Sequence, residues 1–121
     1  MKPAILLVDH GSRRPEANAQ LAALAERVRA RDPQRFVTIA HMELAEPSIA
    51  AGIAACAEAG ASEVVVHPYF LGPGSHTRDD VPRLVEEARK PHAGLVVRVS
   101  APLGLHEKIV DVVLERIETA D

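Results

Sequence analysis

Aromatic side chains are scarce in this chain of 121 residues: Phe, Trp and Tyr together make up 2% of it, and tryptophan does not occur. The core must therefore be built from Ala, Val, Leu and Ile, which suits the packing of helices on a sheet. The same scarcity excludes a surface of stacked aromatics for binding nucleic-acid bases.

The chain also has a single cysteine, a small net charge and no long apolar run. The single cysteine, Cys56, cannot form an internal disulfide framework, and we expect it to be a buried apolar residue. A net charge of −3 gives no overall basic field, so an anionic ligand would have to be met by local arginines. No apolar run reaches the roughly 18 residues of a membrane span, and the opening MKPAILLVDHG is too short for a signal peptide. We therefore expect a soluble cytoplasmic protein that binds neither nucleic acid nor membranes.

Four short β-branched runs alternate with four amphipathic segments, which is the pattern of βαβ units with a parallel sheet. The length fits one domain, over residues 1–121. The runs AILLV and VVV are continuously apolar and predict central strands covered on both faces. The expected strands are residues 4–8, 36–42, 63–67 and 95–100, and the expected helices are residues 15–31, 47–60, 77–90 and 105–118.

Each expected helix has an apolar face at helical spacing. The inward residues are Ala17, Leu21, Leu24, Ala25 and Val28 in the first helix and Ile49, Ile53 and Cys56 in the second. The third helix is expected to start at Thr77, whose hydroxyl can cap it. The last is expected to bury Ile109, Val112, Val113 and Ile117.

His10, Glu43 and His76 follow the first three expected strands and are spaced 33 residues apart, close to the roughly 30 residues of one βα unit. In a parallel sheet every strand-to-helix loop leaves at the carboxyl edge, where open α/β folds bind their ligands. Two imidazoles and a carboxylate at that edge can hold a metal ion and accept protons.

Each of these residues also has a simpler, structural interpretation. His10, in DHGSRR, and His76, in GPGSHT, could be turn or capping residues, but glycine, serine or threonine would serve a turn better, which favours a functional role. Glu43 alone would be a solvated charge, and Glu46 competes with it. Arginines near helix starts are disfavoured by the helix dipole, so Arg13, Arg14 and Arg78 suggest a ligand with carboxylates or phosphates.

The other histidines give weaker evidence of a functional role. His67 ends the third strand, where packing against neighbours is the common outcome, and we expect it at most to support the site. The direction in which His41 faces is left open. His92 and His106 are expected at the surface.

Four segments, LLVDHGSR, HMELAEPSI, HPYFLGPGSHTRDDVP and APLG, together resemble the class II chelatases, and most closely the small, single-domain sirohydrochlorin cobaltochelatase (CbiX-type) family, with sirohydrochlorin ferrochelatases as near relatives. The resemblance implies a flavodoxin-like fold that inserts a divalent metal into sirohydrochlorin without ATP, in cobalamin or sirohaem synthesis. It places His10 and His76 at the metal and gives Glu43 an assisting role. It also implies a homodimer. Asp9 departs from the family, where a small residue often precedes the histidine.

Metal insertion removes two pyrrole protons and replaces the water shell of the ion, and neutral imidazoles can accept protons at neutral pH. The many carboxylates of sirohydrochlorin would be anchored by Arg13, Arg14 and Arg78, with help from Ser12 and Ser75. Cobalt is favoured by the resemblance alone, because imidazole and carboxylate ligands do not select cobalt over iron or nickel by affinity. No organic cofactor is expected.

Other functions remain open at this point. A carrier could use the same histidines to bind metal or tetrapyrrole without turnover. A phosphatase of the phosphohistidine type would need an arginine where Asp9 stands, and a carboxylate there would repel phosphate. A flavodoxin-like regulator or flavin protein would need a Ser/Thr-rich first loop and aromatics around the flavin.

Overall fold

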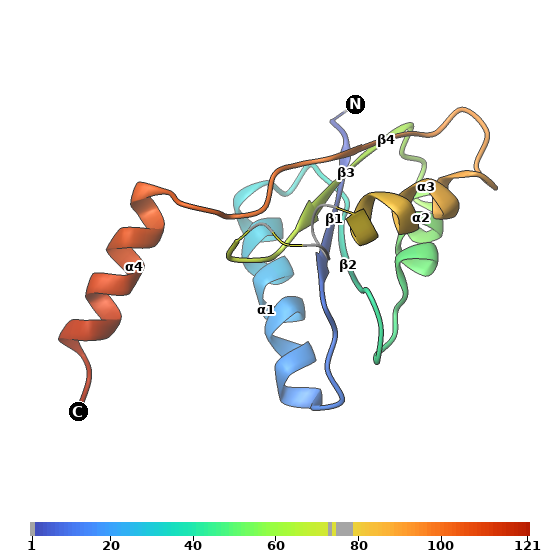
Figure 1. Ribbon diagram of the computed structural model, residues 1–121. Helices are drawn as coiled ribbons and strands as arrows, with labels where there is room; N and C mark the ends of the chain where they lie inside the picture. Colours follow the sequence, from blue (N-terminus) through green and yellow to red (C-terminus); the bar gives the residue numbers. More distant parts are fainter. Residues whose placement is uncertain (1, 73, 75–78) are drawn as a thin grey trace.

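The computed structural model describes residues 2–72, 74 and 79–121. Along the chain these residues form β1 (Ala4–Asp9), α1 (Pro15–Arg31), β2 (Val37–His41), α2 (Ile49–Glu58), β3 (Glu63–Pro68), α3 (Val81–Arg89), β4 (Val96–Val99) and α4 (Glu107–Glu118). The strands pair in parallel in the order β2-β1-β3-β4. Helix α1 lies on one face of the sheet, and α2 and α3 lie on the other (Figure 1). The predicted α/β class, with a parallel sheet of four strands and with four helices, is confirmed for the described residues.

Of the two central strands, β1 packs apolar side chains against helices on both faces, whereas β3 is buried on one face and half-buried on the other. In β1, Leu6 and Val8 belong to the core under α2 and α3, whereas Leu7 packs with Leu21 and Ala25 of α1. The prediction that AILLV forms a central strand is therefore confirmed, as is the burial of Cys56, which is 0% exposed.

Helix boundaries follow local capping rules. Helix α2 starts at Ile49 because the Ser48 hydroxyl accepts a hydrogen bond from the Ala51 amide at 3.1 Å, and the chain turns away after it at Gly60, with φ at +94°. Helix α3 begins at Val81, later than expected, with Pro82 in its first turn, where a missing amide costs nothing. The expected cap, Thr77, lies outside the described residues.

One expectation about helix faces was wrong. Every side chain of α4 is exposed or half-exposed, including Ile109, Val112, Val113 and Ile117, which the periodicity predicted to be buried. The amphipathic pattern is present, but the segment after β4 carries α4 away from the sheet (Figure 1). A smaller error concerns Ala17, which is exposed in the first turn of α1.

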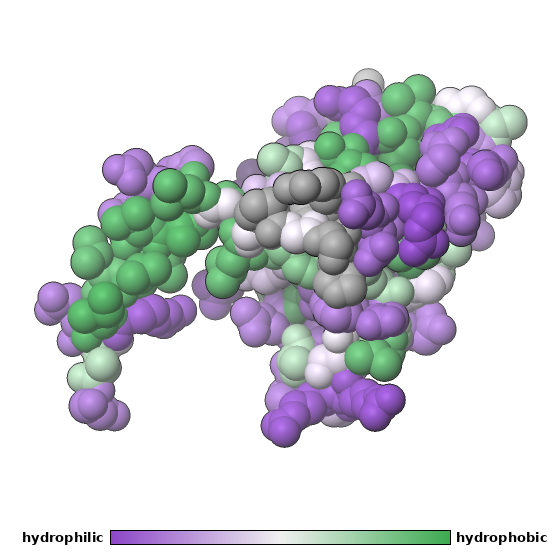
Figure 2. All heavy atoms as spheres, viewed as in Figure 1, coloured by the Kyte–Doolittle hydropathy of each residue, from purple (hydrophilic) through white to green (hydrophobic). Residues whose placement is uncertain are grey.

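The exposed residues of α4 form a stripe. Val110, Val113, Leu114 and Ile117 stand three or four residues apart and are 39–62% exposed, and Figure 2 shows this helix covered with apolar atoms. Among the described residues, no helix combines the length and the apolar character that a membrane crossing requires.

Candidate active site at the carboxyl edge of the sheet

His10 and Glu43 meet where β1 and β2 end. His10 directly follows β1, Glu43 lies two residues beyond β2, and the His10 Nε2 and Glu43 Oε1 atoms are 2.6 Å apart. Their side chains are 43% and 58% exposed. The pair is therefore open to a ligand from outside, as predicted for a site at this edge of the sheet.

The main chain holds the two residues together as well. Beyond the last pair of the strand register, the Met42 amide donates to the Asp9 carbonyl at 2.9 Å and the Glu43 amide donates to the His10 carbonyl at 3.1 Å. Contact between β1 and β2 thus continues into the site. Of the two glutamates that competed in the sequence, the structure brings Glu43 to His10, whereas the Glu46 carboxylate accepts from the Ser48 amide at 3.1 Å.

Gly11 allows the two loops to come this close. Its φ is +93°, and a Cβ atom there would lie 1.9 Å from the Glu43 carbonyl oxygen. The backbone conformation and the approach of the second loop both require glycine. The glycine after His10 is therefore explained by the geometry of the site.

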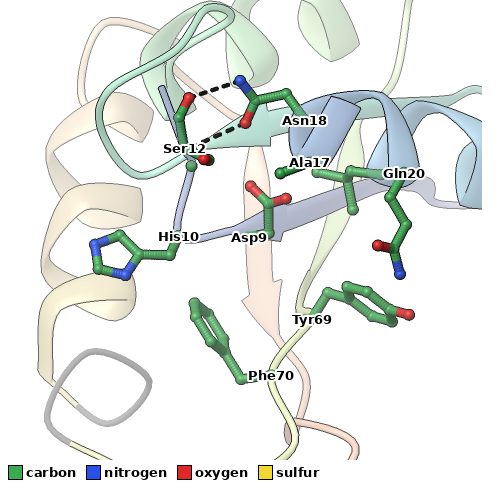
Figure 3. Close-up of a pocket in the computed structure, with 10 residues that line it drawn as sticks. Asp9, His10, Ser12, Ala17, Asn18, Gln20, Tyr69 and Phe70 are labelled. Carbon is green, nitrogen blue, oxygen red and sulfur yellow. Dashed lines mark hydrogen bonds between the residues drawn. The ribbon is translucent and has the colours of Figure 1, made fainter. Parts of the chain in front are cut away.

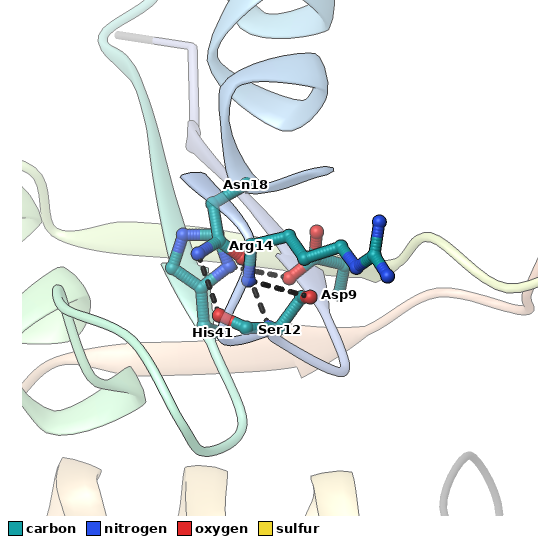
Figure 4. Close-up of polar contacts among 5 residues, drawn as sticks. All are labelled: Asp9, Ser12, Arg14, Asn18 and His41. Atoms are coloured by element: carbon teal, nitrogen blue, oxygen red, sulfur yellow. Dashed lines mark hydrogen bonds and ion pairs between the residues drawn. The ribbon is translucent and has the colours of Figure 1, made fainter. Parts of the chain in front are cut away.

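Asn18, which the sequence analysis missed, fixes the loop after His10. Its side-chain oxygen accepts from the Ser12 amide at 3.0 Å, and its side-chain nitrogen donates to the Ser12 carbonyl at 2.7 Å (Figure 4). The Ser12 hydroxyl in turn accepts from the Arg14 amide at 3.0 Å. An asparagine in the first turn of a helix, facing a tight loop, was the available signal.

Asp9 and His41 form a second pair beneath the first. The His41 Nδ1 and Asp9 Oδ1 atoms are 2.5 Å apart, His41 is 2% exposed, and the Asp9 side chain is 21% exposed. The direction of His41, left open by the sequence, is thereby settled: the ring points inward to the carboxylate that precedes His10 (Figure 4).

Two hollows flank the His10–Glu43 pair. One, of about 290 Å³, is lined by Asp9, His10, Asn18, Tyr69 and Phe70 together with Gly11, Ser12, Ala17, Gln20 and Leu21 (Figure 3). The other, of about 200 Å³, is lined by Met42, Glu43, Asp80, Arg83 and Leu84. The site is thus an open face rather than an enclosed cavity.

The remaining predicted residues are placed only in part. Arg13 and Arg14 are exposed on the loop that follows His10. His76, Ser75 and Arg78 lie outside the described residues. Within the described ranges, no three His, Cys, Asp or Glu side chains form a cluster that could hold a metal ion.

His67 lies apart from the pair, at the end of β3. Its Nδ1 atom is 2.9 Å from the Ser100 hydroxyl. Burial lowers the pKa of His67 below its ordinary value, and a hydrogen bond with the Ala101 backbone offsets part of this effect. The neutral ring therefore serves the packing between β3 and the segment after β4.

Fold and site together define a class: a parallel α/β protein with a histidine and a carboxylate in contact at the ligand-binding edge of its sheet. Comparison with known proteins identifies the family within this class. Residues 4–120 match the CbiX family, and the chain belongs to that family.

Three relatives illustrate the match. The chain is 44% identical over 114 residues to the chloroplastic sirohydrochlorin ferrochelatase of Arabidopsis thaliana, covering 94% of this chain and 51% of the relative. It is 31% identical to the sirohydrochlorin cobaltochelatase of Methanococcus maripaludis, covering 93% of this chain and 96% of the relative. The cobalt complex of the Bacillus subtilis subspecies spizizenii sirohydrochlorin chelatase superposes with a TM-score of 0.91 at 33% identity, covering 98% of this chain and 50% of the other. The chain therefore spans about half the length of the plant and Bacillus proteins.

Proposed function

We propose that this chain is a sirohydrochlorin chelatase, a lyase that inserts a divalent metal ion into sirohydrochlorin without ATP, in cobalamin or sirohaem synthesis. The observation that carries the proposal is the 2.6 Å contact between His10 Nε2 and Glu43 Oε1 at the carboxyl edge of the sheet. Membership of the CbiX family and the names of its relatives support the substrate. They also argue against the phosphatase and flavin-protein alternatives.

The His10–Glu43 pair suits the exchange of a metal for protons. Ligands about 2.1 Å from a metal and at right angles to each other are roughly 3 Å apart, which is close to the spacing of these two atoms. An incoming ion can therefore take the place of the proton that the imidazole and the carboxylate share. The displaced proton passes to water, and once the ring nitrogens have replaced the imidazole and the carboxylate on the ion, these two groups are free to accept the two pyrrole protons.

Further side chains are assigned to the site by this proposal. His76 supplies the second imidazole at the metal, and Arg13, Arg14 and Arg78 meet substrate carboxylates with help from Ser12 and Ser75. Arg13 and Arg14 are exposed and follow Ser12, which lines the hollow next to His10, and this supports their role. Guanidinium groups bind carboxylates in a bidentate manner, which would fix the orientation of the macrocycle.

Cobalt(II) is the metal we propose, with iron(II) as the alternative. The relative of matching length is named a cobaltochelatase, and the structural relative binds cobalt, but the plant relative is named a ferrochelatase. Affinity alone selects neither metal, because nickel and copper bind imidazole and carboxylate more strongly than both.

We also propose that residues 1–121 act as one domain and that two copies form a homodimer. The apolar stripe of α4, Val110, Val113, Leu114 and Ile117, is exposed, and burying it against a second copy would remove it from water. A hollow of about 290 Å³ is also at the small end of ligand pockets, so a second copy would help to enclose a tetrapyrrole.

The decisive experiment is metallation of sirohydrochlorin by the purified protein with cobalt(II), iron(II) or nickel(II), followed by the visible spectrum. We expect insertion faster than the protein-free rate, fastest with cobalt. Insertion no faster than the protein-free rate, with sirohydrochlorin or metal still bound, would establish the carrier function instead.

Variants assign the reaction to the site. His10→Ala should slow insertion about 100-fold or more, since it removes a metal ligand and a proton acceptor. Glu43→Gln should slow it about 10-fold, because the amide keeps the size of the side chain but loses its charge. Glu46→Gln is the matched control and should leave the rate unchanged, because the Glu46 carboxylate accepts from the Ser48 amide of its own loop, whereas Glu43 contacts His10. A normal rate for His10→Ala would remove His10 from the mechanism.

A further inference from the structure

The pair formed by Asp9 and His41 is an unusual feature of this core. His41 is the buried polar residue among the described side chains, 2% exposed, at the end of a strand whose other inward residues are apolar. An imidazole withdrawn from water costs free energy unless a hydrogen bond compensates it. Asp9 supplies that bond at 2.5 Å.

Asp9 and His41 are also the last two partners in the register of β1 and β2. His10 follows Asp9 directly, and Glu43 follows His41 by two residues, so the exposed pair lies just beyond the buried pair at the same ends of the two strands. A displacement of one strand end against the other would shift His10 Nε2 relative to Glu43 Oε1.

We infer that Asp9 and His41 are positioning residues, which hold the ends of β1 and β2 in the alignment that places His10 against Glu43. A buried polar pair suits this role better than apolar packing, because a hydrogen bond has a set direction and length whereas apolar contacts tolerate sliding. The inference rests on the proposed function for its kinetic test only. His41 is buried, whereas Asp9 also lines the hollow beside His10, so an unchanged KM in the Asp9 variants is part of the test.

The kinetic test is a double-mutant cycle between Asp9→Ala and Glu43→Gln, measured well below the unfolding temperature. We expect Asp9→Ala to lower kcat about 10-fold, as much as Glu43→Gln does, with KM changed less than 2-fold, since misplacement of a catalytic group by about 1 Å can cost that much. Asp9→Asn keeps an oxygen acceptor for His41 Nδ1 and should restore kcat to within about 3-fold. In the Glu43→Gln background, removing Asp9 should cost less than about 3-fold, because the contact it positions is already lost.

Two further variants separate positioning from stability. Val64→Ala, in the buried core near the amino ends of the strands, serves as a control that loses stability without touching the pair, and its kcat should stay normal. If Asp9→Ala does not fold, Asp9→Val combined with His41→Phe removes both partners and leaves no unpaired buried group, and its kcat should fall at least 10-fold. A kcat loss for Asp9→Ala that is equally large in the Glu43→Gln background, or that Val64→Ala reproduces, would overturn the inference.

A spectroscopic test does not depend on the reaction. Long-range ¹H–¹⁵N spectra of protein labelled at histidine report the hydrogen bonding of each imidazole nitrogen, and His10→Ala identifies the His10 signals. Asp9→Ala should shift the His10 Nε2 signal, and Val64→Ala should not. If the wild-type protein fails to metallate sirohydrochlorin, the proposed function fails while this spectrum still decides the inference. An unchanged His10 signal in Asp9→Ala would refute it.

Discussion

At the scale of single residues, the site depends on how closely two loops approach. Gly11 carries no Cβ, and the Glu43 carbonyl occupies the space where that atom would be. The same close approach brings the Glu43 amide to the His10 carbonyl at 3.1 Å and the two side chains into contact. A small residue beside the histidine is thus as necessary to the geometry as the histidine itself.

Replacing this glycine should unfold the site. Gly11→Ala places a methyl group 1.9 Å from the Glu43 carbonyl oxygen and strains a backbone with φ at +93°, so we expect a loss of about 3 kcal/mol or more in the free energy of unfolding. The matched control is Gly60→Ala, at φ +94° with open space around it, which should lose only about 1 kcal/mol. Denaturant titration measures both, and equal losses would show that the second loop can move aside.

At the scale of elements, β3 and the segment after β4 are joined through His67 and Ser100. Burial disfavours the charged imidazole, so the pKa of His67 in the folded protein lies below the ordinary value of about 6.5 that it regains on unfolding. The unfolded chain therefore binds the proton first as the pH falls. The stability that the neutral ring contributes is present above about pH 6.5 and is lost between that value and the lower folded-state pKa.

The pH dependence of the free energy of unfolding should therefore depend on His67. Between pH 7.5 and pH 5.5 the free energy of unfolding of the wild type should fall more steeply than that of His67→Gln, which has no group to protonate there. Denaturant midpoints at a series of pH values measure the difference. Parallel curves for the two proteins would mean that His67 is protonated equally well in both states.

At the scale of the whole molecule, the feature to explain is a well-formed amphipathic helix, α4, none of whose side chains is buried by the described part of the chain. The stripe of Val110, Val113, Leu114 and Ile117 lies along one face of α4, away from the sheet (Figures 1 and 2). An apolar stripe of this length indicates an interaction surface. The proposed homodimer would use it.

Charge placed on this stripe should therefore change the oligomeric state. Ile117→Glu puts a carboxylate into the apolar face and should shift the protein from dimer to monomer. Lys108→Gln changes the net charge by the same amount on the opposite face of α4 and should leave the dimer intact. Sedimentation velocity distinguishes the species, and a wild-type protein that is monomeric at micromolar concentration would contradict the proposal.

Much of the architecture follows from local sequence. The alternation of β-branched runs and amphipathic segments predicts the order of elements. The continuously apolar runs predict that β1 and β3 are central, because apolar residues on both faces of a strand are stable only where both faces are covered. Likewise, Pro15 and Asp32-Pro33 predict the bounds of α1, which the structure confirms. The site is predictable only in part: spacing along the chain placed His10 and Glu43 at one edge of the sheet, where the structure brings them into contact.

The tertiary structure alone decided which residues far apart in the sequence contact each other. Periodicity identifies an apolar face on α4 but not what covers it, so the expected burial within the chain was wrong. Three contacts depend on which loops meet in space. His10 contacts Glu43 rather than Glu46, His41 is buried against Asp9, and the Asn18 side chain forms hydrogen bonds with Ser12. Local pattern sets the conformation of each segment, because capping, turns and apolar spacing act within a few residues. The partner of a side chain is set by the packing of the whole sheet.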